Sequence, residues 1–418
     1  MSHRTLRRLF LAALSAACGS AILPAAALAS ARPSLSVSGA ILIEQSSGKV
    51  LYAVNPERRL AIASTTKLMT ALITLEHEPK LSKVFVAPDY HPAAVDSQIG
   101  LSPGERMSVH DLLLGLLLPS GDDAAEDLAV NVGRGSVARF VGMMNARARE
   151  LGLTHTHYST PIGLDTPGNY SSPADLVKLA SHLLTHSPFF ARVVALPSAV
   201  LHSGAVVRHV VNRNDLVGRF PWITGVKTGH TLDAGYVLVG SGHRDGMTLI
   251  SAVLGTPSEG ARDDSTLALL DYGFANFHIV TPVHAKSVIA RPAVRDRPGV
   301  RATLIAADSF TRVIGRNVRI LRRVDAPHEL TGPLPKGAVL GTLLVLADGH
   351  VIARIPLLLA QTLRAVSPLT IAARFVTKPL TLILIVIALL ALLGVALVIR
   401  NRRAGPSPDA GGVDGRTT

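Results

Sequence analysis

The chain has 418 residues, of which 48% are hydrophobic and 17% charged, and its only cysteine is Cys18. This composition excludes a disordered chain, and one cysteine excludes a disulfide scaffold and a cysteine-based metal site. The net charge is +13, from 42 basic and 29 acidic residues. Outside the two ends of the chain we expect this excess to be spread out, with no basic block and few interleaved aromatic residues, so nucleic-acid binding is not expected.

Residues 1–29 have the pattern of a secretory signal peptide. Three arginines within the first eight residues precede the apolar run 9–17, and residues 27–29, Ala-Leu-Ala, form a small-x-small cleavage site. We expect the mature chain to start near Ser30. Cys18 invites a lipoprotein interpretation, which is less favoured because the residues before it lack the usual upstream leucine.

The first folded segment is a predicted β-hairpin. The apolar runs 40–43 and 50–54 flank a turn at Ser47-Gly48. A helix is expected to start near Ser64, because a serine there precedes an apolar helical pattern.

The sequence predicts further helices and strands up to residue 277. Residues 108–132 predict two helices broken at residues 119–121, Pro-Ser-Gly. Residues 172–184 predict an amphipathic helix with a proline in its first turn. Residues 222–255 predict three antiparallel strands with glycine-rich turns, and a helix over 261–277 closes this part of the chain.

Residues 277–367 differ in composition, because Val, Ile, Thr and Arg dominate in short runs broken by Pro and Gly. Within this segment, the apolar runs on either side of Asp348-Gly349 predict a pair of strands joined by a turn at these two residues. The pattern predicts a small all-β domain. Its four histidines have no metal-ligand spacing, so no metal site is expected there.

The C-terminal part holds an uncharged apolar run, residues 379–399, which is long enough to span a bilayer. Arg400, Arg402 and Arg403 follow it directly. Positive residues favour the cytoplasmic side, so we expect a transmembrane helix that runs from outside to inside. Residues 400–418 are expected to form a disordered cytoplasmic tail.

A serine and a lysine begin the helix predicted near Ser64. On a helix, Ser64 and Lys67 share one face, so the amine can reach the hydroxyl. A serine becomes a strong nucleophile when a neighbouring base takes its proton, and a lysine can be that base when burial or another cation lowers its pKa. Ser46 and Lys49 have the same spacing but lie at the predicted hairpin turn, so the pattern favours Ser64.

Two further motifs carry polar chemistry. Ser120-Gly121-Asp122 follows the predicted helix break and, taken alone, is typical of an N-cap. Lys227-Thr228-Gly229 lies in the first predicted strand of the later set. A cation and a hydroxyl on an edge strand suit a carboxylate, and the glycine lets a substrate backbone lie close.

Together, and in this order, the three motifs resemble the Ser-x-x-Lys, Ser-x-Asn and Lys-Thr-Gly motifs of the penicillin-recognising serine enzymes. The chain is similar to the low-molecular-weight penicillin-binding proteins, the serine-type D-alanyl-D-alanine carboxypeptidases. The resemblance is dense over residues 34–276 and looser over 277–367. It implies an α+β catalytic domain (an antiparallel sheet with helices), a β-rich stalk domain and a membrane anchor at residues 379–399.

The resemblance also implies catalytic roles. Ser64 is expected to be acylated, Lys67 to activate it, and Ser120 to relay protons toward the leaving D-alanine. The backbone N–H groups of Ser64 and His230 are expected to form the oxyanion hole.

The implied substrate is a peptidoglycan pentapeptide that ends in acyl-D-Ala-D-Ala, with β-lactams as covalent inhibitors. Lys227 and Thr228 are expected to hold its terminal carboxylate beside Gly229. No metal or organic cofactor is implied, and the catalytic domain is expected outside the cytoplasm, held at the cell membrane by a single span.

One position departs from the family pattern, because Asp122 stands where Asn is usual. An ionised carboxylate only accepts hydrogen bonds, and it favours the protonated form of Lys67. This departure bears on the rate, while Asp and Asn are nearly equal in volume.

Other functions stay open. A D,D-endopeptidase would use the same residues. A class A β-lactamase shares the motifs, but the chain has no Glu-x-x-x-Asn segment for a deacylating water and carries the stalk and anchor. A catalytically weak wall-binding or β-lactam-sensing protein is the third alternative, although Ser64, Lys67 and Lys227 are all present and the tail is short for an effector domain.

Overall fold

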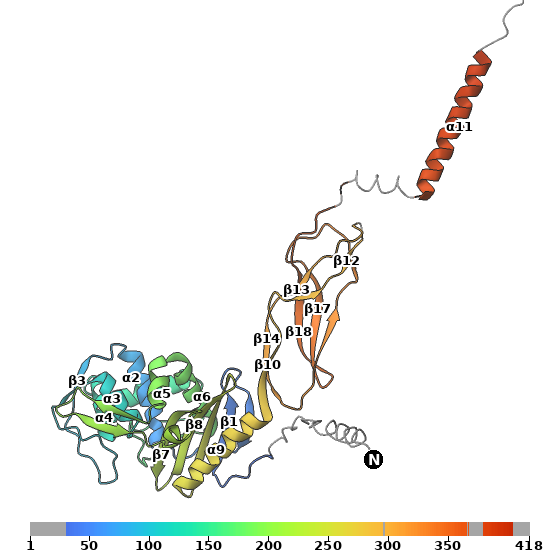
Figure 1. Cartoon of the computed structure of the whole chain (residues 1–418). Helices are drawn as coiled ribbons and strands as arrows, with labels where there is room; N and C mark the ends of the chain where they lie inside the picture. Colours follow the sequence, from blue (N-terminus) through green and yellow to red (C-terminus); the bar gives the residue numbers. More distant parts are fainter. Residues whose placement is uncertain (1–30, 296, 366, 368–378, 404–418) are drawn as a thin grey trace, which may run out of the picture. The chain divides into compact units, whose positions relative to one another are not determined.

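The computed structural model describes residues 31–295, 297–365, 367 and 379–403 (Figure 1). The expected signal peptide and the tail after Arg403 lie outside these residues. The described chain forms two compact units. The first contains the chain up to Val280 together with Arg312–Val318, and the second contains Thr281–Thr311 and the chain from Arg319 onward. The sequence predicts the boundary between residues 276 and 277, a few residues before the end of the first unit at Val280. It does not predict that Arg312–Val318 belongs to the first unit.

The first unit is α+β, which confirms the predicted fold class. Its elements in chain order are β1 Gly39–Glu44, β2 Val50–Val54, the 3₁₀ turn η1 Ala63–Thr66, α2 Lys67–His77, β3 Val84–Val86, β4 Arg106–Ser108, α3 Val109–Leu117, α4 Asp122–Val132, α5 Val137–Glu150, α6 Pro173–His186, α7 Pro188–Val194, β5 Ser198–Leu201, β6 Arg208–Val211, α8 Leu216–Arg219, β7 Ile223–Thr231, β8 Gly235–Arg244, β9 Met247–Thr256 and α9 Glu259–Asn276.

The main sheet has the strand order β2-β1-β9-β8-β7, with every neighbouring pair antiparallel. Successive side chains of a strand point to opposite faces. In β1, Ile41 and Ile43 therefore join a core with the helices α2 to α7, whereas Ala40 and Leu42 join a second core with Leu269 of α9. Both faces of the sheet are covered, which explains why all six residues of β1 are buried.

Most of the predicted elements are confirmed. The hairpin is β1–β2, the helix near Ser64 is η1 followed by α2, and the break at residues 119–121 separates α3 from α4. The structure adds α5, α7 and α8 and the small hairpins β3–β4 and β5–β6, which the sequence analysis did not predict.

The second unit contains a five-stranded sheet in the order β11 (Val288–Ala290), β13 (Leu304–Ala306), β18 (His350–Leu359), β17 (Val339–Ala347) and β15 (Ile320–Asp325). It has a core of its own, which includes Leu304, Val345 and Leu357. The predicted strand pair around Asp348-Gly349 is β17–β18. The strands from the end of the first unit onward are β10 Phe277–Val283, β11 Val288–Ala290, β12 Ala293–Val294, β13 Leu304–Ala306, β14 Phe310–Gly315, β15 Ile320–Asp325, β16 Glu329–Leu330, β17 Val339–Ala347 and β18 His350–Leu359.

The last described helix, α11, covers Pro379–Arg403, and none of its residues is buried. Within the described residues it alone is long and apolar enough to cross a membrane. The expected span 379–399 lies inside it. The prediction that disorder starts right after the span is wrong for residues 400–403, which complete the last helical turn and carry Arg400, Arg402 and Arg403.

Candidate active site

Ser64 and Lys67 lie where the predicted helix begins. Ser64 is in η1, Lys67 is the first residue of α2, and Lys67 Nζ lies 2.9 Å from Ser64 Oγ. Ala63, just before the serine, has a left-handed φ of 47°. Such a conformation costs energy in a residue with a Cβ, and residues of this kind gather at functional sites. The backbone therefore presents Ser64 at a tight turn ahead of the helix.

Lys67 is fully buried and fully hydrogen-bonded. Besides Ser64 Oγ, its Nζ lies 2.6 Å from Asp122 Oδ1 and 2.8 Å from the carbonyl oxygen of Ile162. An ammonium has three protons, and these three acceptors use all of them. Burial lowers the pKa of Lys67; Asp122 opposes this effect, and Arg213 adds to it. The lysine is thus held next to the serine hydroxyl, and its lowered pKa makes the neutral amine easier to form.

Asp122 is a partner of Lys67 and does not cap α4. It is the first residue of α4, the N-cap Gly121 has no side-chain cap, and Asp122 Oδ2 accepts a 2.9 Å hydrogen bond from the N–H of Ser97. Burial raises the pKa of Asp122, while Lys67 and the Ser97 N–H act in the opposite direction. The interpretation of Ser120-Gly121-Asp122 as an N-cap is therefore wrong.

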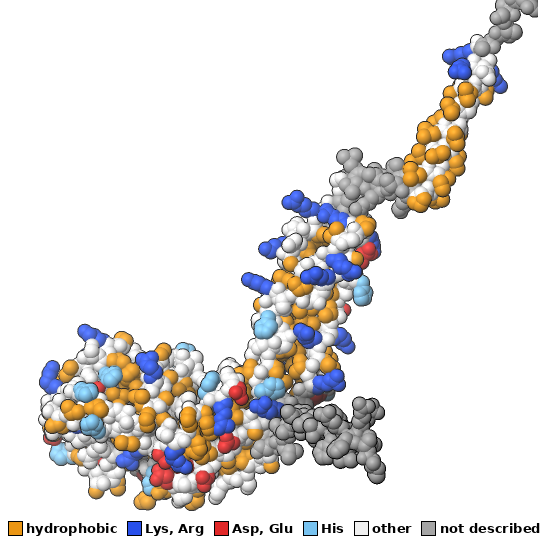
Figure 2. Space-filling model, viewed as in Figure 1, with side chains coloured by type: hydrophobic (Ala, Val, Ile, Leu, Met, Phe, Trp, Pro, Cys, Tyr) orange, Lys and Arg blue, Asp and Glu red, His pale blue; other side chains and the backbone are white. Residues whose placement is uncertain are grey.

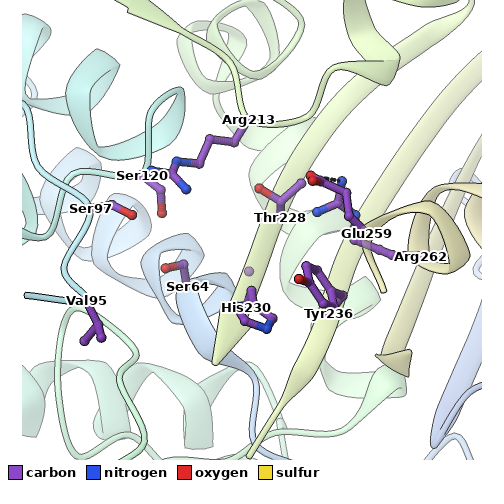
Figure 3. Close-up of a pocket in the computed structure, with 11 residues that line it drawn as sticks. Ser64, Val95, Ser97, Ser120, Arg213, Thr228, His230, Tyr236, Glu259 and Arg262 are labelled. Carbon is purple, nitrogen blue, oxygen red and sulfur yellow. Dashed lines mark hydrogen bonds and ion pairs between the residues drawn. The ribbon is translucent and has the colours of Figure 1, made fainter. Parts of the chain in front are cut away.

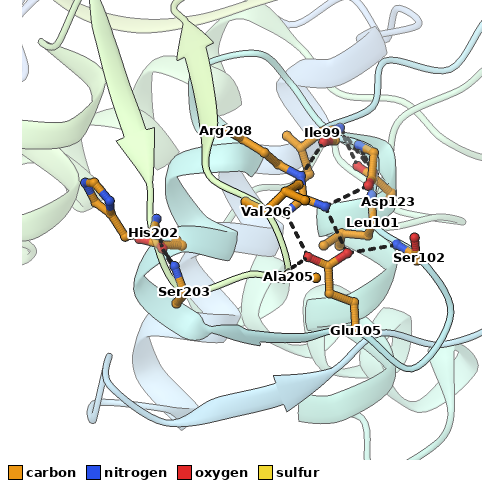
Figure 4. Close-up of polar contacts among 12 residues, drawn as sticks. Ile99, Leu101, Ser102, Glu105, Asp123, His202, Ser203, Ala205, Val206 and Arg208 are labelled. Carbon is orange, nitrogen blue, oxygen red and sulfur yellow. Dashed lines mark hydrogen bonds and ion pairs between the residues drawn. The ribbon is translucent and has the colours of Figure 1, made fainter.

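Two buried carboxylates, Asp123 and Glu105, hold the segment that follows Ser97 (Figure 4). The Asp123 carboxylate accepts hydrogen bonds from the backbone N–H groups of Ile99, Gly100 and Leu101. Glu105 pairs with Arg208 at 2.8 Å, with both side chains largely buried. These contacts hold the segment that donates to Asp122, and so they set the position of the carboxylate beside Lys67.

Ser120 is the second hydroxyl of the site. It has a left-handed φ of 72°, and its Oγ is buried with no hydrogen-bond partner among the described residues. It lines the same cavity as Ser64 (Figure 3). A buried hydroxyl without a partner costs stability, so this one is available for a bound molecule.

The third motif lies on β7, the edge strand of the sheet. Thr228, Gly229 and His230 line the cavity with Ser64. A Cβ built on Gly229 would lie 2.9 Å from the backbone nitrogen of Ser64. Gly229 is therefore needed for the close approach of β7 to the serine itself, rather than only for the approach of a substrate.

Lys227 is placed differently from the other residues of its motif. Its side chain is 1% exposed, does not line the cavity, and donates to the carbonyl oxygen of Thr228 at 3.0 Å. Burial holds the pKa of Lys227 well below its usual value, and the positive Lys67 and Arg213 contribute in the same direction. The expected carboxylate receptor thus has Thr228 at the cavity surface and Lys227 behind it.

The cavity has a volume of about 360 Å³ and includes polar residues that the sequence analysis missed. Arg213 donates from Nε to the carbonyl oxygen of Pro119, and Figure 3 shows its side chain directed toward Ser120. Arg262, in the first turn of α9, is buried and paired with Glu259 and Asp263 at 2.9 and 2.8 Å. Neither arginine lies in a recognisable motif, because only the fold brings them to this cavity.

Known proteins are similar to this chain in sequence and in fold. Residues 26–258 match the family model described as D-alanyl-D-alanine carboxypeptidase. The chain belongs to that family. It is 30% identical to the D-alanyl-D-alanine carboxypeptidase DacF of Bacillus subtilis over 80% of this chain and 88% of the relative, and 35% identical to DacC of Escherichia coli over 79% and 84%.

Solved structures that are similar to this chain support its place in the D-alanyl-D-alanine carboxypeptidase family. Penicillin binding protein 5 from Haemophilus influenzae matches with a TM-score of 0.64 and 28% identity, over 80% of this chain and 99% of that one. The Streptomyces K15 DD-transpeptidase matches with a TM-score of 0.56 and 35% identity, over 59% and 100%. The resemblance inferred from the three motifs is confirmed, and the chain is a serine peptidase of the carboxypeptidase class.

Proposed function

We propose that this carboxypeptidase removes the terminal D-alanine from peptidoglycan stem peptides through an acyl-enzyme on Ser64. The observation that carries the proposal is the 2.9 Å contact between Lys67 Nζ and Ser64 Oγ in a cavity that also holds Ser120 and Thr228. The family supplies the reaction, and this contact supplies a nucleophile with its base.

Acylation starts when Lys67, as the neutral amine, takes the proton of Ser64. The serine Oγ then attacks the carbonyl carbon between the two D-alanines. The negative charge on the carbonyl oxygen is stabilised by the N–H groups of Ser64 and His230. Since β7 is an edge strand, only one of its sides is paired in the sheet, and Gly229 keeps it against the Ser64 backbone.

Departure of D-alanine needs a proton on its nitrogen. Lys67 returns the proton through the Ser120 hydroxyl, which lies in the same cavity without a protein partner among the described residues. The C–N bond breaks and D-alanine leaves with an amino group. Water then attacks the carbonyl carbon of the Ser64 ester. The bond between this carbon and Ser64 Oγ breaks, the shortened peptide leaves with a carboxyl group, and a proton from the water restores the serine hydroxyl.

The substrate carboxylate binds beside Thr228. The Thr228 hydroxyl and the guanidinium groups of Arg213 and Arg262 line this part of the cavity. Glu259 and Asp263 offset part of the charge of Arg262, whereas Lys227 adds a buried amine behind Thr228. A charged donor in a partly dry cleft binds a carboxylate more strongly than one in open solvent.

Carboxylate recognition is tested with Lys227→Ala and Thr228→Val on two substrates, acyl-D-Ala-D-Ala and its amide-capped analogue. Each variant should lose more kcat/KM on the free acid than on the amide. Equal losses on both substrates contradict a carboxylate site at β7.

For localisation, we propose that α11 anchors the protein in the cell membrane with the catalytic unit outside the cytoplasm. The helix has no charged residue before Arg400, and its last turn carries three arginines. A chain that ends before Pro379 and lacks residues 1–29 should be soluble and active. If this chain stays in the membrane fraction after a high-salt wash, which screens exposed charges, the anchor lies elsewhere.

The acyl-enzyme is tested with fluorescent penicillin followed by mass spectrometry of the labelled peptide, alongside D-alanine release from acyl-D-Ala-D-Ala. We expect a stoichiometric label on Ser64 and release of D-alanine. A label on another residue, or none, contradicts the acyl-enzyme. Transfer of the acyl group to an added amine in preference to water would make the protein a transpeptidase.

A further inference from the structure

The charge of the chain is divided unequally between its two folded parts. In the first unit, residues 31–280 and 312–318 contain 22 Lys and Arg against 22 Asp and Glu, a net charge of 0, whereas in the β-rich second unit residues 281–311 and 319–367 contain 11 against 5, a net charge of +6. The largest share of the net charge of +13 therefore lies in the β-rich unit, and the expectation that the excess is spread out is wrong. Figure 2 shows many Lys and Arg side chains on that part and few acidic ones.

Six of these cations gather where the β-rich unit ends. We call this group the basic end; it consists of Arg291, Arg295, Arg297, Arg301, Lys336 and Arg364. Arg297 donates to the carbonyl oxygen of Arg364 at 3.0 Å, and Arg301 donates to that of Arg291 at 3.1 Å. The backbone N–H of Lys336 bonds to Thr362, and Leu334 pairs with Leu363.

The basic end is exposed, and its six cations outnumber the two acidic residues next to them, Asp296 in the sequence and Glu329 in an ion pair. All of its members except the half-buried Arg297 are exposed. The one ion pair recorded for it in the described chain is Arg295 with Glu329, at 3.0 Å. The exposed apolar Val300 stands in the turn between Arg297 and Arg301. Cations around a small apolar tip are what a membrane surface with anionic headgroups attracts.

The same end is where the chain continues toward α11. Arg364 belongs to the basic end, and α11 starts at Pro379. The segment 365–378 can reach no more than about 50 Å even when fully extended. If α11 is in a bilayer, as proposed above, this tether keeps the basic end close to the bilayer surface at a high effective concentration.

We propose that the basic end docks on the anionic phospholipid surface of the membrane that α11 enters. The contact fixes the β-rich unit at the bilayer, so the protein is held by two signals, an apolar span and an electrostatic footprint. The inference rests on the proposed anchoring for its geometry, but the footprint can be measured without the helix. A soluble acidic polymer would have charge complementarity too, but it lacks the tether.

The test uses residues 31–367, which keep all three buried clusters, since α11 contributes no buried residue. Binding is measured by co-sedimentation with phosphatidylcholine vesicles, with and without about one third phosphatidylglycerol. We expect binding only with the anionic lipid, weakening as salt is added, because salt screens exposed charges.

The decisive variant is the triple substitution Arg291→Gln, Lys336→Gln and Arg364→Gln. None of these side chains makes a recorded hydrogen bond or ion pair within the described chain, so the fold should not change. A cation at an anionic surface contributes about fivefold in binding, and the triple variant should therefore lose at least about tenfold in vesicle partitioning.

The matched control removes the same charge elsewhere in the β-rich unit, by Arg319→Gln, Arg323→Gln and Arg354→Gln. These three are exposed; Arg319 lies at the β17–β18 turn end of the sheet, and Arg323 and Arg354 lie on its strands. The control should lose less than about twofold. Equal losses in both variants, or vesicle binding independent of phosphatidylglycerol, overturn the basic end as the docking site.

Two further measurements keep the outcomes distinct. Binding of the unchanged fragment to dextran sulfate but not to anionic vesicles would identify a soluble polyanion as the partner and overturn the membrane proposal. D-alanine release by each variant should equal that of the unchanged fragment. Loss of this activity in the unchanged fragment would contradict the proposed function, while the vesicle result would still decide the docking proposal.

Discussion

The chain contains the Ser-x-x-Lys pattern twice, at Ser46 and at Ser64, and the two copies have different surroundings. Ser46 lies in the turn after β1, where its Oγ donates to Glu44 Oε2 at 3.0 Å. Ser64 lies just before α2, where its Oγ is 2.9 Å from Lys67 Nζ. The same spacing therefore gives a serine–lysine contact in one copy, whereas the serine of the other copy bonds to a carboxylate.

The lysines differ as much as the serines. Lys49 Nζ donates to the carbonyl oxygen of Val313 at 3.0 Å and is only partly buried, while Lys67 is fully buried beside Asp122. Residues three apart share a face on a helix but not in a hairpin turn. The comparison shows that spacing alone does not make the pair; the helical backbone and a buried lysine are both needed.

The largest effect is expected from the serines. Ser64→Ala should abolish penicillin labelling and D-alanine release, because Ser64 is the one hydroxyl that bonds to Lys67 Nζ in the described part of the chain. Ser46→Ala is the matched control and should leave both activities within about twofold, since surface changes away from a site have small effects. Fluorescent penicillin labelling on a gel and D-alanine release measure the result. Persistent labelling of Ser64→Ala contradicts the assignment.

The lysines are expected to show the next largest difference. Lys67→Ala should reduce the acylation rate by about 10²- to 10⁴-fold, the usual contribution of a positioned general base. Lys49→Ala should leave it unchanged. Stopped-flow acylation by a chromogenic β-lactam gives both rates. Comparable losses in the two variants would show that Lys67 acts through charge or stability rather than as the base, and thermal unfolding of both variants identifies a loss of stability.

A smaller loss is expected when the strand against Ser64 is pushed away. Gly229→Ala would place a Cβ 2.9 Å from the Ser64 nitrogen, so β7 or the serine turn must shift. A displacement of about 1 Å at a reacting group can cost about 10²-fold. Gly142→Ala, where nothing lies within 4 Å of the added Cβ, is the control. Acylation rates as low in Gly142→Ala would contradict this explanation.

Much of the catalytic unit could be predicted from the sequence, because its signals are local. The hairpin, the helix at Ser64 and the break before α4 follow from apolar periodicity and from Pro and Gly. The serine–lysine contact follows from helical geometry. These features need only neighbours within a few residues, and the structure has them at the predicted positions.

The parts that were missed depend on contacts between distant residues. Arg213 and Arg262 carry no motif and reach the cavity only through the fold. The position of Lys227 behind Thr228 depends on how β7 packs against η1. The uneven charge could have been counted from the sequence, but the gathering of cations at the basic end required the pairing of residue 334 with 363.

The smallest and most informative difference concerns Asp122, a partner that Lys49 lacks. While Asp122 is ionised, it favours the protonated form of Lys67, and the acid limb of the acylation profile lies at higher pH. In Asp122→Asn, an amide oxygen can keep the Ser97 N–H bond while the amide NH₂ donates to the neutral amine of Lys67. The volume is almost unchanged.

We therefore expect Asp122→Asn to move the acid limb of kcat/KM downward by about one to three pH units, the usual effect of one close opposite charge. Acylation near neutral pH should become faster. The opposing influence is burial, which raises the pKa of Asp122 and lowers that of Lys67, so that both tend toward their neutral forms. If burial already keeps the carboxyl neutral at the working pH, the acid limb will not move, because no charge is removed.

Acylation rates of both proteins measured across pH, with thermal unfolding at each pH, separate these cases. An unchanged limb with lower stability means that Asp122 only packs and hydrogen-bonds, whereas a downward shift at equal stability means that the carboxylate sets the pH at which Lys67 becomes a base.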